Sequence, residues 1–189
     1  MTKNRLLNIS IVLCKFIKLG YIVFFIGLTF VFVHVQMDRD YYKGMEVTIN
    51  ADSTDFFISS RSMLKSESTD TNIYTLDNIK TFSLYLGYFQ LSGILLVLFL
   101  STKEFQKVLE SVKKVKSFEE DNIKSFRRIG KFIFIYALLT SFQIMNFNKG
   151  YFHGFGISLT PLFLILLAFI MGEMFKEGYA LKQENDLTI

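Results

Sequence analysis

The chain has 189 residues, of which 51% are hydrophobic and 22 are Phe, whereas Trp is absent and Pro occurs once. This composition excludes a water-soluble domain built around a central core. The single cysteine, Cys14, excludes an intramolecular disulfide. The sequence therefore predicts an integral membrane protein that forms one domain over residues 1–189.

Four apolar segments are long enough to cross a bilayer, which requires about 20 helical residues. They cover approximately residues 12–35, 81–101, 129–147 and 156–176. In hydrocarbon every backbone amide must be hydrogen-bonded within its own segment, so these segments are expected to be helices. The expected fold is an all-α bundle of four transmembrane helices. A cleaved signal peptide is the alternative for the first segment, but no small-residue cleavage site precedes Met37.

The Lys and Arg residues are divided unequally between the two sides of this layout. Fifteen lie in the amino end, the 101–131 segment and the carboxyl tail, and six lie on the other side. Because cytoplasmic loops carry an excess of positive charge, both termini and the loop 102–128 are expected in the cytoplasm. The tail 177–189 then also faces the cytoplasm, and the loop 36–80 is extracytoplasmic.

The extracytoplasmic loop 36–80 contains eight carboxylates and five basic residues. It also contains short apolar runs at 45–50, 55–59 and 72–76, which predict strands. A small β cap that senses a ligand is one interpretation of this loop. A partly ordered linker is the other.

The cytoplasmic loop 102–128 predicts two helix starts. Ser101 and Glu104 fit a capping box, and apolar residues follow at intervals of three and four, which indicates an amphipathic helix. Its opposite face is basic, with Lys103, Lys107, Lys113 and Lys114. Such a helix can lie on an anionic membrane surface or dock a partner. Ser117 and Glu120 mark a second start, which leads into the third transmembrane segment.

The chain contains none of the usual signs of catalysis or ion transport. No ionisable residue lies in the middle of a span, and Gln90 and Gln143 are expected to hydrogen-bond between helices. His34 and His153 fall near the outer membrane edge, without four metal ligands at a useful spacing. We expect no enzymatic activity, no catalytic residue, no cofactor and no metal site.

Two segments of the chain carry a family resemblance. Residues 117–123 (SFEEDNI) and 126–130 (FRRIG), together with 175–178 (FKEG) and 181–189 (LKQENDLTI), resemble the bacterial family called domain of unknown function 2975. The resemblance implies a small four-helix protein of the inner membrane whose function is uncharacterised. It also implies a possible partner, a small helix-turn-helix regulator of the Cro/CI type.

The cytoplasmic ends of the last two helices are expected to be neighbours, because a short turn joins these helices. Arg127, Arg128 or Lys131 should then reach Glu173 or Glu177. Gly178 is expected to fray the last helix. The tail beyond it either binds a partner or is frayed or packed on the membrane. The candidate partner-binding residues are Phe118, Asn122, Arg127, Arg128, Glu173, Glu184, Asp186, Leu187 and Ile189.

The expected function is that of a membrane-anchored signalling or regulatory protein, which acts through its cytoplasmic loop and carboxyl tail. A small transporter or channel-like protein is the first alternative, and a structural membrane protein without a ligand is the second. The expected partners are the lipid bilayer and the regulator that the resemblance implies. No direct binding of nucleic acid is expected, and the formation of a homo-oligomer is left open.

Overall fold

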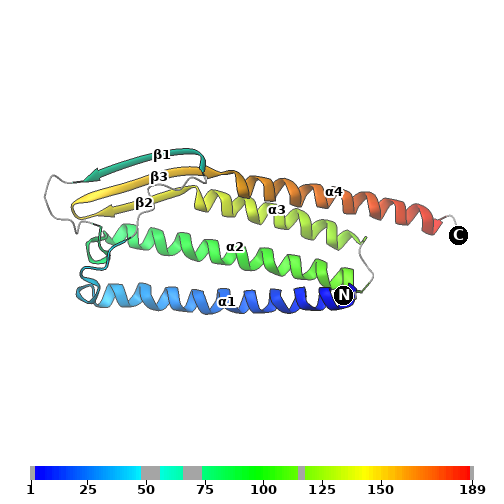
Figure 1. Ribbon diagram of the computed structural model, residues 1–189, viewed down its shortest axis with the longest axis horizontal. Helices are drawn as coiled ribbons and strands as arrows, with labels where there is room; N and C mark the ends of the chain where they lie inside the picture. Colours follow the sequence, from blue (N-terminus) through cyan, green and yellow to red (C-terminus); the bar gives the residue numbers. More distant parts are fainter. Residues whose placement is uncertain (1–2, 48–55, 66–73, 115–117, 188–189) are drawn as a thin grey trace. The chain divides into compact units, whose positions relative to one another are not determined.

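The computed structural model describes residues 3–47, 56–65, 74–114 and 118–187. It consists of long helices and a small antiparallel sheet (Figure 1). The helices are α1 (Lys3–Met37), α2 (Thr81–Lys113), α3 (Glu120–Thr140) and α4 (Leu159–Leu187), and the strands are β1 (Phe56–Lys65), β2 (Phe142–Phe147) and β3 (Gly150–Ser158). Two 3₁₀ turns, Asp40–Tyr42 and Leu76–Asn78, lie between α1 and α2 in the sequence.

The chain divides into two compact units, which are described separately. Unit 1 comprises Met1–Ile22, Leu96–Tyr136 and Thr160–Ile189. Unit 2 comprises Val23–Leu95 and Ala137–Leu159, and it contains the whole sheet. The expectation that residues 1–189 form a single domain stays a prediction.

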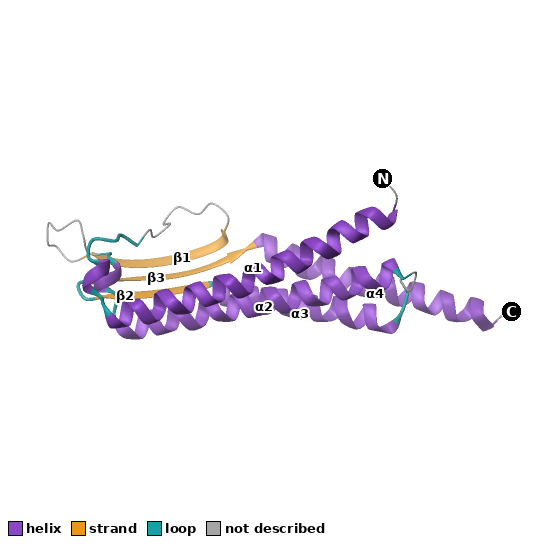
Figure 2. Ribbon diagram, turned by 90° about the horizontal axis from the view of Figure 1, so that it is seen from below, coloured by secondary structure: helices purple, strands orange, loops and turns teal. Residues whose placement is uncertain are grey.

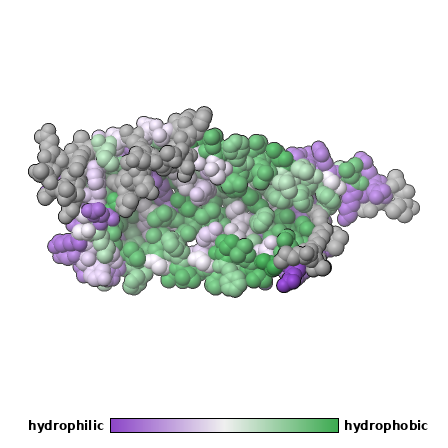
Figure 3. Space-filling view, in the orientation of Figure 1, coloured by the Kyte–Doolittle hydropathy of each residue, from purple (hydrophilic) through white to green (hydrophobic). Residues whose placement is uncertain are grey.

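Three helices in the described part of the chain, α1, α2 and α4, are long and apolar enough to cross a membrane. The most apolar stretch of α1 has no buried residue, and apolar side chains cover much of the surface over the helices (Figure 3). A water-soluble protein does not expose so much apolar surface. These helices therefore indicate a membrane location. With 33 residues, α2 is about 50 Å long, so its polar end after Leu100 extends beyond the part needed to span about 30 Å of hydrocarbon.

The third expected span, 129–147, differs from the structure. Helix α3 begins earlier, at Glu120, and ends at Thr140, and strand β2 follows at Phe142. Six charged residues lie in the first twelve positions of α3, so only nine residues, 132–140, remain as its uninterrupted apolar part. The fourth expected span, 156–176, also begins later, because residues 156–158 belong to strand β3 and α4 starts at Leu159. The sequence of β2 is apolar enough to be mistaken for the end of a helix.

The sheet has the strand order β1-β3-β2, and both pairings are antiparallel (Figure 2). A two-residue connection, Asn148 and Lys149, joins β2 to β3 in a hairpin. The expected β cap is confirmed in part, since β1 covers the predicted strand at 55–59. The runs at 45–50 and 72–76 contribute a single bridge between Glu46 and Thr75, and the rest of them lies largely outside the described residues. The central strand of the sheet comes from residues that the sequence analysis assigned to a turn and a helix.

Polar side chains connect the elements of unit 2. The Gln90 amide donates hydrogen bonds to the carbonyl oxygens of Leu139, at 2.6 Å, and Phe142, at 2.7 Å. These carbonyls lie where α3 ends, and a helix end leaves carbonyl groups without a partner inside the helix. The expected role of Gln90 as a hydrogen-bonding residue between elements is thus confirmed.

The two histidines have neighbouring polar partners in unit 2. His34 Nδ1 lies 3.0 Å from the Tyr42 hydroxyl, and His153 Nε2 lies 2.9 Å from Asn146 Oδ1. His34 also contacts the rings of Tyr41 and Tyr42 edge-on. The described residues contain no cluster of three or more His, Cys, Asp or Glu that could hold a metal ion.

Unit 1 has its own apolar core, formed by α2, α3 and α4. The buried members are Val108, Phe126, Ile129 and Ala168, and Val112, Ile133, Met171 and Phe175 pack against them. The predicted capping box at Ser101 is wrong, because α2 continues through this position to Lys113. No Gly or Pro occurs between residues 94 and 113 to end the helix. Residues 102–113 therefore do not form a separate amphipathic helix, and two members of their apolar face pack within the protein.

Candidate functional site

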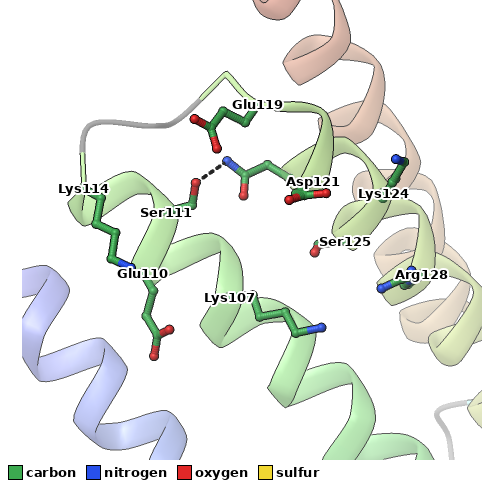
Figure 4. Close-up of a pocket in the computed structure, with 10 residues that line it drawn as sticks. Lys107, Glu110, Ser111, Lys114, Glu119, Asp121, Lys124, Ser125 and Arg128 are labelled. Atoms are coloured by element: carbon green, nitrogen blue, oxygen red, sulfur yellow. Dashed lines mark hydrogen bonds between the residues drawn. The ribbon is translucent and has the colours of Figure 1, made fainter.

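A polar cleft lies in unit 1, between the last turns of α2 and the first turns of α3 (Figure 4). Its volume is about 530 Å³. The lining contains four basic, three acidic and three neutral polar residues: Lys107, Lys114, Lys124, Arg128, Glu110, Glu119, Asp121, Ser111, Asn122 and Ser125. The cleft therefore carries charges of both signs rather than a single excess charge.

The buried carboxylate of Glu104 lies beside this cleft, and the residue is only 6% exposed. Glu104 Oε1 is 2.6 Å from Lys107 Nζ, and Glu104 Oε2 accepts a hydrogen bond of 2.9 Å from the Ser125 hydroxyl. The guanidinium of Arg128 approaches Oε2 to 3.6 Å from the other helix. One carboxylate thus connects α2 to two residues of α3.

The electrostatic surroundings of Glu104 keep it ionised. Burial alone raises the pKa of this carboxyl, because it removes water from the charged form. Hydrogen bonds from Lys107 and Ser125, together with the charges of Lys107 and Arg128, outweigh burial and bring the pKa of Glu104 below its ordinary value. The charge is therefore part of the structure at neutral pH.

A second polar contact joins the same two helices closer to their ends. Asn122 is 2% exposed, and its side-chain amide donates a hydrogen bond of 2.9 Å to the Ser111 hydroxyl. The backbone N–H of Asn122 donates to the Glu119 carbonyl at 3.0 Å. A buried amide that loses its partner costs about 1–3 kcal/mol. This contact therefore fixes the start of α3 against the last turns of α2.

An ion pair joins α3 to α4 on the surface of unit 1. Arg127 Nη2 lies 2.6 Å from Glu173 Oε1, and Lys176 Nζ lies 3.4 Å from the other oxygen of the same carboxylate. The expected pairing between the ends of the last two helices is confirmed. Because all three side chains are largely exposed, water screens the pair, and it contributes to orientation more than to stability.

An aromatic contact attaches the start of α3 to α4. The ring of Phe118 lies 5.7 Å from the ring of Phe175, which in turn lies 4.9 Å from the ring of Phe126. Phe118 also lies so close to Gly178 that a Cβ atom at this glycine would overlap its ring. The predicted fraying at Gly178 is wrong, since α4 continues to Leu187. The glycine provides space for Phe118.

The structure brings five of the predicted site residues to one end of unit 1. They are Phe118, Asn122, Arg127, Arg128 and Glu173. Glu184 lies further along α4 in an exposed stretch, residues 181–185. The side chains of Asp186 and Leu187, and the whole of Ile189, lie outside the described residues.

The side chains that organise the cleft are not among the predicted site residues. Glu104 is predicted only as part of a helix cap, and Ser111 and Ser125 are not predicted at all. A signal for Glu104 exists, because Val97, Glu104, Val108 and Ser111 follow one another at intervals of seven, four and three, which places them on one helix face. A carboxylate on a face with two buried valines requires partners within the protein.

The profile of a family described as "Protein of unknown function (DUF2975)" matches residues 67–189. The chain belongs to the DUF2975 family. The resemblance noted in the sequence is thereby confirmed. The DUF2975 match covers α2, α3, α4 and the β2–β3 hairpin, and so includes every residue of the cleft, but it excludes α1 and β1. No curated protein and no solved structure matches the chain.

The contact between Phe118 and Gly178 leads to a first prediction. An Ala in place of Gly inside a helix normally stabilises a protein by about 0.5–1 kcal/mol. Gly178→Ala should instead lower the melting temperature in detergent, because the new methyl displaces the ring of Phe118. The control is Gly20→Ala, since a Cβ atom at Gly20 meets no atom within 4 Å.

A double variant separates the contact between Phe118 and Gly178 from any general effect of a substitution at position 178. In Phe118→Ala, adding Gly178→Ala should no longer destabilise, because the ring that it displaces is already absent. If Gly178→Ala stabilises the wild-type chain as much as Gly20→Ala does, the packing of Phe118 on α4 is not as described.

The network around Glu104 leads to a second prediction. Glu104→Gln should lower the free energy of unfolding by about 1–3 kcal/mol at pH 7, because hydrogen bonds from Lys107 and Ser125 lose their charged acceptor. Glu110→Gln is the control, since it removes the same charge from α2 where the partner is the neutral Gln106. Thermal unfolding followed by circular dichroism measures both effects.

The pH dependence follows from the lowered pKa of Glu104. A carboxylate with a lowered pKa in the folded state stabilises fully above its ordinary value, 4.5, and this stabilisation is lost as the pH falls through the lower folded pKa. The difference between the wild type and Glu104→Gln should therefore shrink below pH 4.5. A difference that stays constant down to pH 3 would contradict this account.

Proposed function

We propose that the chain is a multi-pass protein of the bacterial cytoplasmic membrane that acts as a membrane-anchored regulatory partner of a cytoplasmic protein. The observation that carries the proposal is that the polar cleft and the exposed end of α4 belong to one compact unit. Phe118 and Arg127 attach the first turns of α3 to α4 at positions 173–178, a few residues before the exposed stretch 181–185. A partner can therefore contact the loop region and the tail together.

The proposed topology has four crossings, with both termini in the cytoplasm. The proposed third crossing begins at the apolar end of α3, residues 132–140, and continues into strand β2, because residues 120–131 lie on the cytoplasmic side. Within unit 1 the start of α3 is bonded to α2 at Ser111, and within unit 2 the end of α3 is bonded to α2 at Gln90. The distribution of Lys and Arg supports a cytoplasmic position for the 101–131 segment.

The surface of unit 1 has the features of a protein-binding surface. The charges of both signs in the cleft favour one orientation of a partner that carries complementary charges. Leu181 in α4 is 66% exposed, and α4 extends past the start of α3 (Figure 1). Burying a leucine of this kind in an interface contributes about 1.5–3 kcal/mol. The family resemblance suggests a small helix-turn-helix regulator as the class of partner.

The regulatory role is better supported than transport. Carriers coupled to ions or protons use ionisable residues within their spans. The apolar stretches 19–37, 81–101 and 159–172 contain no Asp, Glu, Lys or Arg. The charged lining of the cleft favours a partner-binding role over a structural role without a ligand.

The topology is tested with reporter fusions. A reporter that is active only in the cytoplasm should function after Ile189 and after Lys114, and it should be inactive when inserted at Glu67. A reporter that is active only outside the cytoplasm should give the reverse pattern at the same three positions. Cytoplasmic activity at Glu67 would overturn the proposed orientation.

The partner is tested by photocrosslinking in the native cell. A photoreactive amino acid at position 181 and one at position 114 should both crosslink to the same soluble protein, because both positions face the proposed contact. The matched control is position 163 in α4, where the Phe side chain is 66% exposed in a candidate span and should crosslink to lipid. Mass spectrometry identifies the products.

Two substitutions then test whether the contact is specific. Leu181→Asp should abolish the crosslink from position 114, because it places a charge in the apolar part of the contact. Ala180→Asp adds the same charge to the neighbouring exposed residue and should leave the crosslink intact. A crosslink that survives Leu181→Asp would show that α4 is not part of the contact.

A further inference from the structure

A second cavity, in unit 2, has a very different lining from the polar cleft. It is a groove of about 380 Å³ between α1, α2 and β2. Its walls include Leu28 and Val31 from α1, Leu84 and Leu91 from α2 and Ile144 from β2. None of the lining residues is charged. The groove is open along part of its length, within helices that are candidate membrane spans.

The lining indicates the kind of molecule that fits this groove. Apolar cavities do not hold ordered water, because water requires two to four polar partners. The volume is at the lower end of the range for small-molecule sites, about 300–1,000 Å³. An open groove of about 380 Å³ holds most of one acyl chain and is too small for the two chains of a phospholipid. The uncharged lining also disfavours a charged headgroup, since an unpaired charge in such surroundings is costly.

Five polar residues line the groove, and most of them are occupied by bonds within unit 2. Gln90 donates to two backbone carbonyls, the Tyr88 hydroxyl lies 3.1 Å from Thr29 Oγ1, and Ser83 accepts from the Asn146 N–H. Thr140 donates to the carbonyl of its own helix. Within the described residues, the exposed amide of Gln143 has no such bond, and it can both donate and accept.

We propose that this groove is a binding site for a neutral single-chain lipid, whose acyl chain lies along the apolar walls and whose hydroxyl head hydrogen-bonds to Gln143. The proposal is independent of the regulatory role of unit 1. A neutral lipid with one chain and a hydroxyl head matches the size, the absence of charge and the single available amide.

Two glycines offer a matched pair of variants. A Cβ atom at Gly87 meets no atom within 4 Å, and Gly87 lines the groove, so Gly87→Leu places an apolar side chain in the groove. A Cβ atom at Gly27 also meets no atom within 4 Å, but Gly27 does not line the groove. Both residues lie in helices of unit 2, so the two substitutions change helix propensity and surface apolarity similarly.

The experiment titrates the purified full chain in detergent with 1-oleoylglycerol and counts bound molecules by native mass spectrometry. We expect one saturable molecule per chain for the wild type and for Gly27→Leu, and at least tenfold weaker binding for Gly87→Leu. Gln143→Leu should weaken the binding of 1-oleoylglycerol and leave the binding of 1-octadecene unchanged, because the hydrocarbon has no head to bond. Equal melting temperatures for the Gly87 and Gly27 variants establish that both are folded.

Several results would overturn the proposal. Absence of saturable binding to the wild type would do so, as would equal affinities for the Gly87 and Gly27 variants. Tighter retention of a two-chain phosphatidylglycerol than of 1-oleoylglycerol would show that the groove takes ordinary bilayer lipid. If Gly87→Leu does not fold, the Gln143→Leu variant decides. An equal loss of affinity for 1-oleoylglycerol and for 1-octadecene in this variant would exclude the hydrogen bond between the lipid head and Gln143.

Discussion

The absence of water in a bilayer requires every backbone N–H and C=O group to find a partner within the protein. The long helices α1, α2 and α4 meet this requirement through their own hydrogen bonds. Helix α3 ends after 21 residues, and its chain continues as a strand, which leaves carbonyl groups at Leu139 and Phe142 to be satisfied by other means. The Gln90 amide binds both of them. The change from helix to hairpin therefore depends on one side chain from a different helix.

Much of the helical part could be predicted from the sequence, because runs of apolar residues report directly on contact with lipid. The β2–β3 hairpin could not, since apolar residues at 142–147 suit a helix in hydrocarbon as well as a strand. A helix and a strand differ here in where the backbone hydrogen-bond partner comes from: within the segment for the helix, and from another strand for the strand. The partner of β2 is β3, and β3 pairs in turn with β1, which lies far away in the sequence. Periodicity within a segment carries no information about such a distant partner.

Part of the candidate site could be predicted from the sequence and part could not, for a related reason. Arg127 and Glu173 were paired correctly, because a helical hairpin and opposite charges suffice to bring them together. Glu104 was misinterpreted, because its sequence surroundings also fit a helix cap. Its role depends on Ser125 and Arg128, which another helix supplies. A buried carboxylate with several partners loses solvation and gains a defined geometry, so its contribution is to specify how α2 meets α3.

Strand β3 passes into α4 without an intervening loop, since Ser158 ends the strand and Leu159 begins the helix. Two residues alone connect β2 to β3. One residue added within β3 would exchange the two faces of the strand beyond the insertion, and the side chains there would change sides of the sheet. The hairpin therefore tolerates a change in chain length less well than the segments outside the sheet.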